Sequence, residues 1–386
     1  MRNVNFCMKL AVLGAVFCLT TSEMEVPTSL HAPKYGNPLK VRQIYQLTDL
    51  GETDVDPARL VKNPLQPSLT PTINNLGQVI GNRIEGGFVR DPGNGEFAPH
   101  IHDVVINFHT LNDRGDILVS YNRRNDPTEW MIWPTTRGSN GSRDSLRLPQ
   151  SENSSLTMIG LTNDRHVVGN IVQNDRVHPV VWSQSKGMSD VRTPNGQPIL
   201  GSAVGLTDKL EIVGFFDRGS HDAPGAWTPQ EGVKFIRNYR SKVGQDADVV
   251  LGDIAAAPDG TVYGTYRVHY QNDPTKDQDV HYAYAWSPSE GGFKLLDLSN
   301  MRINAINSSH VLVGTLYGKA AVCWPGQSPL AISTLIKTED AKGWEFLEAT
   351  GINDAGQIVG YGKFNGKMRI FLLDQFIKGT PVIAEG

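Results

Sequence analysis

The sequence predicts an all-β fold, a β-propeller of seven four-stranded blades that is closed by its own N-terminal strand. Three observations predict it: a nine-residue pattern recurs seven times, a short strand with a terminal aromatic residue follows the copies, and the strand missing from the last repeat has a match near the N-terminus. Each repeat has the size of one propeller blade, which is a four-stranded antiparallel sheet. The 39 glycines and 23 prolines among 386 residues fit many tight turns between short strands.

The nine-residue pattern combines a turn with a strand. Its clearest copy, Ile352–Gly360, reads Ile-Asn-Asp-Ala-Gly-Gln-Ile-Val-Gly. Asn and Asp bond their own backbone and glycine permits a positive φ, so the first half predicts a turn, and the β-branched run after it predicts a strand. The copies start between 38 and 50 residues apart, at Ile73, Leu111, Leu161, Leu206, Ala256, Ile306 and Ile352.

The last residue of the pattern is glycine in six of the seven copies, with Val119 as the exception. Glycine inside a strand indicates a close approach of another part of the chain. We expect this approach where the inner strands of the blades crowd around a central axis.

A short strand that ends in tryptophan follows the pattern in five repeats. These tryptophans are Trp133, Trp182, Trp227, Trp286 and Trp324. Large aromatic side chains at repeating positions are expected to pack one blade against the next. The alternative is a surface aromatic binding site.

The ends of the chain predict how the ring closes. A fourth strand completes each unit, as in 292–298, but the last repeat has no clear one. The segment Ile44–Gly51 resembles that fourth strand, so we expect it to pair beside 368–373 and remove an exposed sheet edge. The first repeat spans only 38 residues, and a degenerate blade there would leave six.

Seven copies in register, five of them followed by a strand that ends in tryptophan, resemble the HAF repeat family of bacterial extracellular proteins. The similarity spans about residues 41 to 376. The family is named for a His-Ala-Phe at the start of its third strand, and this chain keeps that histidine in the third repeat alone, at His178. The resemblance implies a propeller-like fold and export, and it implies no particular reaction.

The N-terminus predicts export. Arg2 and Lys9 precede the apolar run Leu10–Leu19, and small or polar residues follow, which is typical of a secretory signal peptide. We expect a signal peptide at 1–22, an extended leader at 23–40, one propeller domain at 41–378 and a tail at 379–386. The alternatives are a buried N-terminal helix or a lipoprotein attached at Cys18. The mature protein is expected to be secreted, at the cell surface or in the periplasm, with no membrane span, because no second apolar segment reaches ~20 residues.

The net charge bears on which partners are expected, and the cysteine content bears on whether a thiol could act as a nucleophile. The formal net charge is −4 and no long basic run occurs, so nucleic acid is not an expected partner. Cys323 is the third of three cysteines and lies beyond the expected signal peptide, in an apolar strand. It is therefore expected to be a buried structural thiol rather than a nucleophile.

Two groups of polar residues are candidate sites. Loops on one rim of a propeller often carry function, and five residues before or within the aromatic-ended strands are candidates for a binding rim: His178, Asp217, His221, Asp222 and His281. Histidines two apart on a strand share a face, so a metal site is also conceivable at His100, His102 and Asp103, with His109 nearby. Otherwise no cofactor is expected.

The chain lacks a Gly-x-Ser-x-Gly elbow, a His-Glu-x-x-His motif and a phosphate-binding loop. The expected function is therefore a binding or interaction module for a protein, peptide or glycan. One alternative is a saccharide-directed hydrolase or lyase with a site in the central channel. Another is a structural cell-surface repeat protein, since propellers host unrelated functions.

Overall fold

The structure is a computed structural model. It describes residues 44–55, 69–84, 86–93, 95–97, 105–122, 128–135, 145–149, 155–219, 222–236, 247–270, 279–289, 291–296, 298 and 300–376. All of these lie within Val41–Val382, which forms one compact unit. The expected signal peptide, leader and tail fall outside the described residues, and so do His100, His102, Asp103 and His221.

The first three blades are formed by consecutive strands. Blade 1 contains β2 (Thr72–Ile73), β3 (Val79–Arg83), β4 (Gly86–Asp91) and β5 (Gly95–Phe97). Blade 2 contains β6 (Val105–Leu111), β7 (Asp116–Asn122), β8 (Glu129–Pro134) and β9 (Leu146–Arg147). Blade 3 contains β10 (Ser155–Leu161), β11 (Val167–Gln173), β12 (Arg176–Ser183) and β13 (Gly187–Asp190).

The next three blades follow the same order. Blade 4 contains β14 (Gly201–Leu206), β15 (Ile212–Asp217), β16 (Asp222–Thr228) and β17 (Gly232–Phe235). Blade 5 contains β18 (Ala247–Ala256), β19 (Val262–Tyr270), β20 (Asp279–Trp286) and β21 (Phe293–Leu296). Blade 6 contains β22 (Met301–Ile306), β23 (Leu312–Leu316), β24 (Lys319–Cys323) and β25 (Leu330–Ala331).

Blade 7 combines the two ends of the propeller. It contains β26 (Trp344–Ile352), β27 (Ile358–Phe364), β28 (Lys367–Gln375) and, on its outer edge, β1 (Tyr45–Glu52). A 3₁₀ helix (Ile332–Leu335) and the short helix α1 (Thr338–Ala341) lead from blade 6 into this blade.

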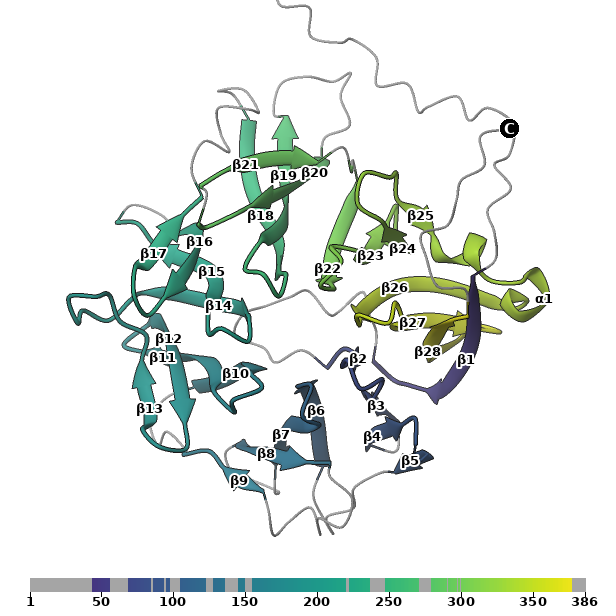
Figure 1. The fold of residues 1–386 in the computed structure, drawn as a ribbon, viewed down its shortest axis with the longest axis horizontal. Coiled ribbons are helices and arrows are strands. Elements are labelled where there is room, and N and C mark those ends of the chain that lie inside the picture. Colours follow the sequence, from purple (N-terminus) through teal and green to yellow (C-terminus); the bar gives the residue numbers. More distant parts are fainter. Residues whose placement is uncertain are drawn as a thin grey trace, which may run out of the picture. The chain divides into compact units, whose positions relative to one another are not determined.

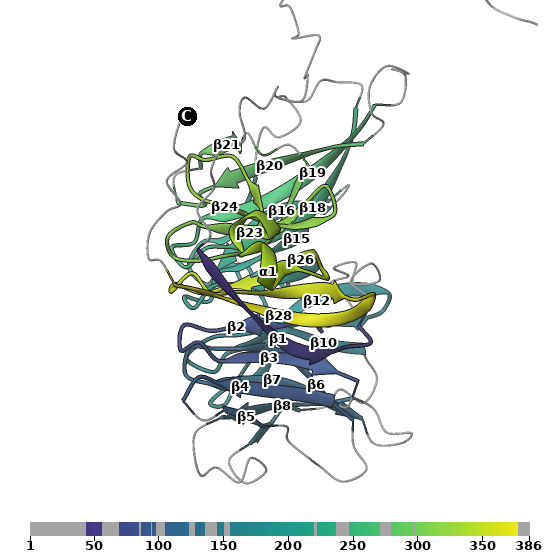
Figure 2. The same cartoon turned by 90° about the vertical axis from the view of Figure 1, so that its right-hand side faces the viewer.

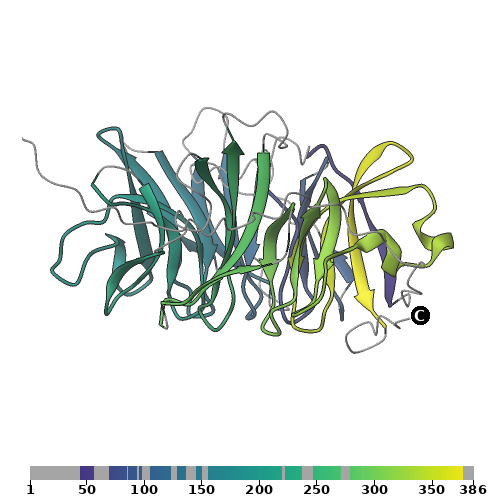
Figure 3. The same cartoon turned by 90° about the horizontal axis from the view of Figure 1, so that it is seen from above.

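The seven sheets form a closed ring. Each is a four-stranded antiparallel meander, and its first strand contacts the first strand of the next blade. The first strand of blade 7, β26, contacts β2 of blade 1, so the ring closes in chain order (Figure 1). Figures 2 and 3 show the same ring from its side. The prediction of seven blades is confirmed, because the 38-residue first repeat forms a complete blade with a first strand of only two residues.

The N-terminal strand closes the last blade as the sequence predicts. In the register of the β1–β28 pair, Leu47 faces Leu373 and Asp49 faces Phe371. Tyr45 and Leu50 of β1 are buried in the cores on either side of this sheet. The strand thus supplies both backbone pairing and core side chains to a blade that begins almost three hundred residues later.

The tryptophans pack between blades, as expected. Trp182 of blade 3 lies in one buried cluster with Trp130 and Ile132 of blade 2. Trp227 of blade 4 shares a cluster with Val168 of blade 3. Each cluster therefore joins two sheets, which is how a propeller builds its core.

In five blades the glycine that ends the repeat pattern faces an irregularity in the neighbouring strand. In six blades the register of the first two strands shifts within the first strand, as it does in blade 6 between Ile303 and Ala305. Gly314 pairs with Ile303, and a Cβ built on it would overlap the carbonyl oxygen of Arg302. The predicted close approach is thus confirmed for this glycine. The group that approaches belongs to β22, the preceding strand of the same blade, rather than to another blade at the axis.

Replacing Gly314 with alanine should destabilise the protein. The added methyl group would force apart two paired strands, at a cost of about 1–3 kcal/mol in the free energy of unfolding. Chemical denaturation followed by circular dichroism measures it. The matched control is Gly292→Ala, because a Cβ there meets no atom within 4 Å. Equal stability of the two variants would contradict the steric explanation.

Cys323 is buried, with its thiol near the backbone carbonyl oxygens of Trp324 and Gln327, at 3.5 and 3.2 Å. Burial raises the pKa of the thiol to about 11, so it carries little thiolate near neutral pH.

In the described part of the chain, no helix combines the length and the hydropathy that crossing a membrane requires.

Candidate functional site

The seven turns between the first and second strands of the blades share one geometry, and we call them the hub turns. In the blade 7 turn, the Asn353 N–H donates to the Gln357 carbonyl and its side-chain Oδ1 accepts the Gln357 N–H at 3.0 Å. The last residue of every hub turn has a left-handed backbone, which is glycine in four blades and Arg165, Leu210 or His310 in the others. The hub turns are residues 74–77, 112–115, 162–165, 207–210, 257–260, 307–310 and 353–356.

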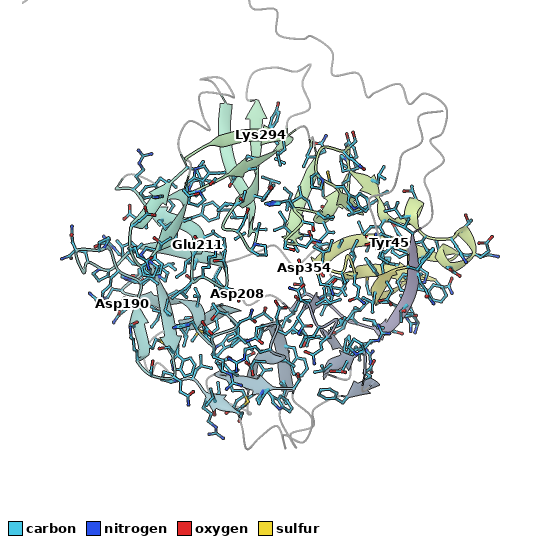
Figure 4. All side chains as sticks on the ribbon, in the orientation of Figure 1. Tyr45, Asp190, Asp208, Glu211, Lys294 and Asp354 are labelled. Carbon is cyan, nitrogen blue, oxygen red and sulfur yellow. The ribbon has the colours of Figure 1, made fainter. Side chains whose placement is uncertain are left out.

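Hydrogen bonds link the hub turns to one another around the axis. The second residue of the Asn-Asp pair donates its backbone N–H to the side-chain oxygen of the same residue in the next blade. These bonds run from Asn75 to Asp113 (2.7 Å), from Asp113 to Asn163 (2.8 Å), from Asn163 to Asp208 (2.9 Å), from Ser308 to Asp354 (2.8 Å) and from Asp354 to Asn75 (2.8 Å). We call this chain of bonds the hub ring. Figure 4 shows Asp208 and Asp354 beside the centre of the propeller.

A second set of bonds follows the same direction. Where the first residue of the pair is asparagine, its side-chain Nδ2 donates to the carbonyl of the next hub turn. These bonds join Asn74 to Asn112 (2.8 Å), Asn112 to Thr162 (2.9 Å), Asn307 to Asn353 (3.1 Å) and Asn353 to Asn74 (3.0 Å). The Asn-Asp pairs of the repeat thus hold the blades together, in addition to shaping their own turns.

The hub ring is broken at blade 5. Its hub turn reads Ala-Pro-Asp-Gly, so Pro258 occupies the position of the ring residue. Proline has no N–H to donate and no side-chain oxygen to accept, so neither neighbour can bond to it. Among the described residues, the backbone N–H of Asp208 and the hydroxyl of Ser308 therefore have no hydrogen-bond partner, and both residues are exposed.

A histidine from blade 6 crosses the junction beside this break. The Nδ1 of His310 lies 2.9 Å from the hydroxyl of Tyr263, and its Nε2 lies 3.3 Å from Oδ2 of Asp259. The rings of Tyr263 and His310 are tilted against each other with centroids 5.8 Å apart. The left-handed backbone of His310 aims its side chain back at blade 5, where the other blades have glycine or a different side chain.

The surroundings set the protonation of two members of this group. Burial alone would raise the pKa of Asp259, but hydrogen bonds from the backbone and hydroxyl of Thr261, together with His310, hold it below its ordinary value. Burial and the Asp259 carboxylate raise the pKa of Tyr263. Asp259 is thus an acceptor and Tyr263 a neutral hydroxyl over the whole physiological pH range.

A second carboxylate borders the break on the side of blade 4. Glu211 lies at the blade 4–blade 5 junction, because a Cβ built on Gly260 would meet its carboxylate oxygen. Its Oε2 also accepts a hydrogen bond from the Thr207 hydroxyl at 3.2 Å. We define the hub break as the group Asp208, Glu211, Pro258, Asp259, Tyr263, Ser308 and His310 (Figure 4 labels Asp208 and Glu211).

The residues predicted for a binding rim lie on the other face of the propeller. His178, Asp217, Asp222 and His281 are near the ends of the second and third strands, whereas the hub turns join the first and second strands. Asp217 and Asp222 face each other across one hairpin, and Asp217 accepts the Gly219 N–H at 2.6 Å. No side-chain hydrogen bond or ion pair between described residues joins His178, Asp217 and Asp222, which come from two blades. The side chain of His281 is not described, so the rim stays a prediction.

The predicted metal residues are outside the described residues, and that site also stays a prediction. Their neighbour His109 is buried in β6, where its Nε2 lies 2.7 Å from the Ser120 hydroxyl and its ring packs on Trp130 at 4.8 Å between centroids. In the part of the chain that the structure describes, no group of three or more His, Cys, Asp and Glu residues is arranged to hold a metal ion.

The hub break was not among the sites predicted above, although the sequence carries a signal for it. When the seven copies of the pattern are aligned, Pro258 replaces the Asn, Asp or Ser of the other six. His310 likewise replaces the glycine of the clearest copies. A departure from the repeat can indicate a specialised blade. The structure is needed to see that this departure removes the hub-ring hydrogen bonds on both sides of blade 5.

Comparisons with known proteins do not identify a family. No protein-family model matches the chain, and no curated protein matches it. Solved structures similar to it include a chain of the mitotic checkpoint complex (11% identity, 94% of this chain and 99% of that chain, TM-score 0.45) and the polysaccharide lyase Uly1 (10% identity, 89% and 92%, TM-score 0.46). The SapL1 lectin in complex with alpha methyl fucoside is similar over 69% of this chain and 97% of that chain (14% identity, TM-score 0.35). The chain is a seven-bladed β-propeller whose last blade is completed by its N-terminal strand.

Proposed function

We propose that the chain is an exported binding module for a protein, peptide or glycan, and that it binds its ligand on the face of the hub turns. The observation that carries this proposal is the hub break. It exposes hydrogen-bonding groups that have no partner among the described residues, at one place in a ring that is otherwise bonded to itself. Export rests on the N-terminal signal pattern of the sequence.

The hub turns suit a binding surface because they are held in place before any ligand arrives. Each turn is fixed by its own backbone bonds, and five junctions between blades carry a bond of the hub ring. A preorganised surface loses little conformational entropy on binding. Loops on a rigid scaffold are also where binding residues are most often found.

The group at the break favours binding over catalysis. A Tyr–His–Asp chain could serve the alternative function, a saccharide-directed hydrolase or lyase. A base would need a tyrosine whose pKa is lowered, whereas burial and Asp259 raise the pKa of Tyr263. A general acid would need a carboxyl group whose pKa is raised, and that of Asp259 is lowered. The third possibility, a purely structural repeat, predicts no binding at this face.

Binding should depend on the hub break and not on the opposite face. We would screen the labelled full chain on arrays of oligosaccharides and peptides, then measure the affinity of any ligand by titration calorimetry. Asp259→Ala combined with His310→Ala should weaken binding at least 10-fold, because it removes an ionised acceptor and an aromatic donor. The matched control, Asp217→Ala combined with Asp222→Ala, changes two exposed residues of the opposite face and should keep the wild-type affinity.

Two outcomes would contradict the proposal. If the wild-type chain binds nothing on either array, the result supports the alternative that the chain is a purely structural repeat protein. If the Asp217/Asp222 variant loses binding and the Asp259/His310 variant keeps it, the ligand belongs to the predicted rim. Cleavage of a bound saccharide, measured as new reducing ends, would favour the enzyme.

A further inference from the structure

We infer that the hub break is a binding site for a neutral saccharide. This inference rests on the proposed function and names its ligand class and its place. Two independent observations lead to it: the interruption of the hub ring at Pro258, and the Asp259–His310–Tyr263 group that spans the junction between blades 5 and 6 beside it.

The polar groups of the hub break match the hydroxyl groups of a sugar. A sugar hydroxyl donates one hydrogen bond and accepts others, so it needs donors and acceptors side by side. The Asp208 N–H is a donor without a partner among the described residues, and the Ser308 hydroxyl can act in both directions. Asp259 supplies an ionised carboxylate whose side chain is 54% exposed.

An apolar surface lies among these polar groups. Pro258 is exposed, and the His310 side chain is 34% exposed while its ring rests beside Tyr263. The C–H face of a pyranose ring can pack on such a surface while its hydroxyls reach the groups around it. Small-molecule sites commonly combine an apolar floor with a few polar groups that fix orientation.

The charges of the hub break select against an acidic sugar. Glu211 and Asp259 place two carboxylates beside the blade 5 hub turn, whereas the Asp208 carboxylate accepts its hydrogen bonds from Asn163 of blade 3. Lys209 is the one lysine or arginine in the hub turns of blades 4, 5 and 6. Like charges at close range disfavour each other, so a uronate should bind poorly. A basic peptide would also meet the carboxylates favourably, and its carbonyl groups can accept a hydrogen bond from the Asp208 N–H, so a basic peptide is the competing ligand class that the probes below include.

The test is to complete the hub ring with Pro258→Asn. The new residue would be of the type that blades 1 and 3 have at this position, where Asn75 and Asn163 each donate and accept one ring bond. Its amide oxygen would accept the Asp208 N–H, and its own N–H would donate to Ser308. We expect the melting temperature to rise by about 1–3 °C and the affinity for a neutral hexasaccharide to fall at least 10-fold.

The probes are cellohexaose, mannohexaose, xylohexaose, hexagalacturonate and hexalysine, titrated into the full chain by calorimetry. The matched control is Pro325→Asn, which changes an exposed proline in the outer turn between β24 and β25. It should keep the wild-type affinity for whichever neutral hexasaccharide binds.

Each outcome decides the inference. Binding of a neutral hexasaccharide that Pro258→Asn weakens and Pro325→Asn does not supports it. Binding that Pro258→Asn leaves unchanged overturns the site, while the proposed binding function stands. Binding of hexagalacturonate or hexalysine alone overturns the ligand class and again leaves the function standing. No binding of any probe overturns the inference, and no binding on the wider arrays overturns the proposed function as well.

Discussion

Removal of residues 1–52 will abolish cooperative folding of the propeller. The deletion removes β1 and with it the buried side chains of Ile44, Tyr45 and Leu50. Burying a large apolar side chain stabilises a protein by about 1.5–3 kcal/mol, so these three amount to about 5–9 kcal/mol. This is as large as the whole stability of many domains. The deletion also leaves the backbone of β28 as an open edge that other chains can pair with.

A far-ultraviolet circular dichroism melt measures the effect. The truncated chain should show no cooperative transition and should aggregate, whereas the full chain should melt in one step. The control is a permuted chain that starts at Thr53 and carries residues 44–52 after Phe376 through an Asn-Gly turn. The turn is short enough because Tyr45 pairs with Gln375 and the Phe376 N–H donates to the Ile44 carbonyl at 3.1 Å. A truncated chain that melts cooperatively would show that β1 is dispensable.

The sequence was informative where the structure depends on short-range physics. The turn of Ile352–Gly360 follows from the preferences of Asn, Asp and Gly, and the strand after it follows from its β-branched residues. The closing strand at 44–51 was found because a repeat fold must satisfy the same pairing in every blade, so a missing strand has to come from elsewhere. The packing of tryptophans between blades was predicted from their recurrence at the same position in the repeats.

The sequence was less informative where blades meet. That Asn75 bonds to Asp113 and Asn163 to Asp208 depends on the curvature of the ring, which brings residues 38 and 45 positions apart into contact. The requirement for glycine at position 314 also comes from the neighbouring strand β22, because the register shift in β22 cannot be read from the sequence pattern. Because contacts between blades are not visible in the sequence, the predicted sites were loops that carry histidines. The interruption of the hub ring by Pro258 was not predicted.

Arg165 gives a sharp test of how the blades are held together. It has a left-handed backbone (φ 59°), and its Nε and Nη2 donate to Asp116 of the preceding blade at 2.9 and 2.7 Å. The Asp116 side chain is only 2% exposed, and Arg165 is the cation that pairs with it. Glycine occupies the position of Arg165 in blades 1 and 2, and there the residue beneath is a neutral glutamine, Gln357 or Gln78.

Arg165→Gly should therefore destabilise the protein, although glycine suits the backbone better. Relief of the left-handed strain contributes about 1 kcal/mol, whereas a buried carboxylate without its partner costs about 3–5 kcal/mol. We expect a net loss of about 2–4 kcal/mol in the free energy of unfolding, measured by chemical denaturation at neutral pH. Adding Asp116→Asn to this variant should recover at least half of the loss, because a neutral amide of the same shape needs no counter-charge. If the double variant is no more stable than Arg165→Gly, then the packing of the arginine side chain, and not the charge of Asp116, joins blades 2 and 3.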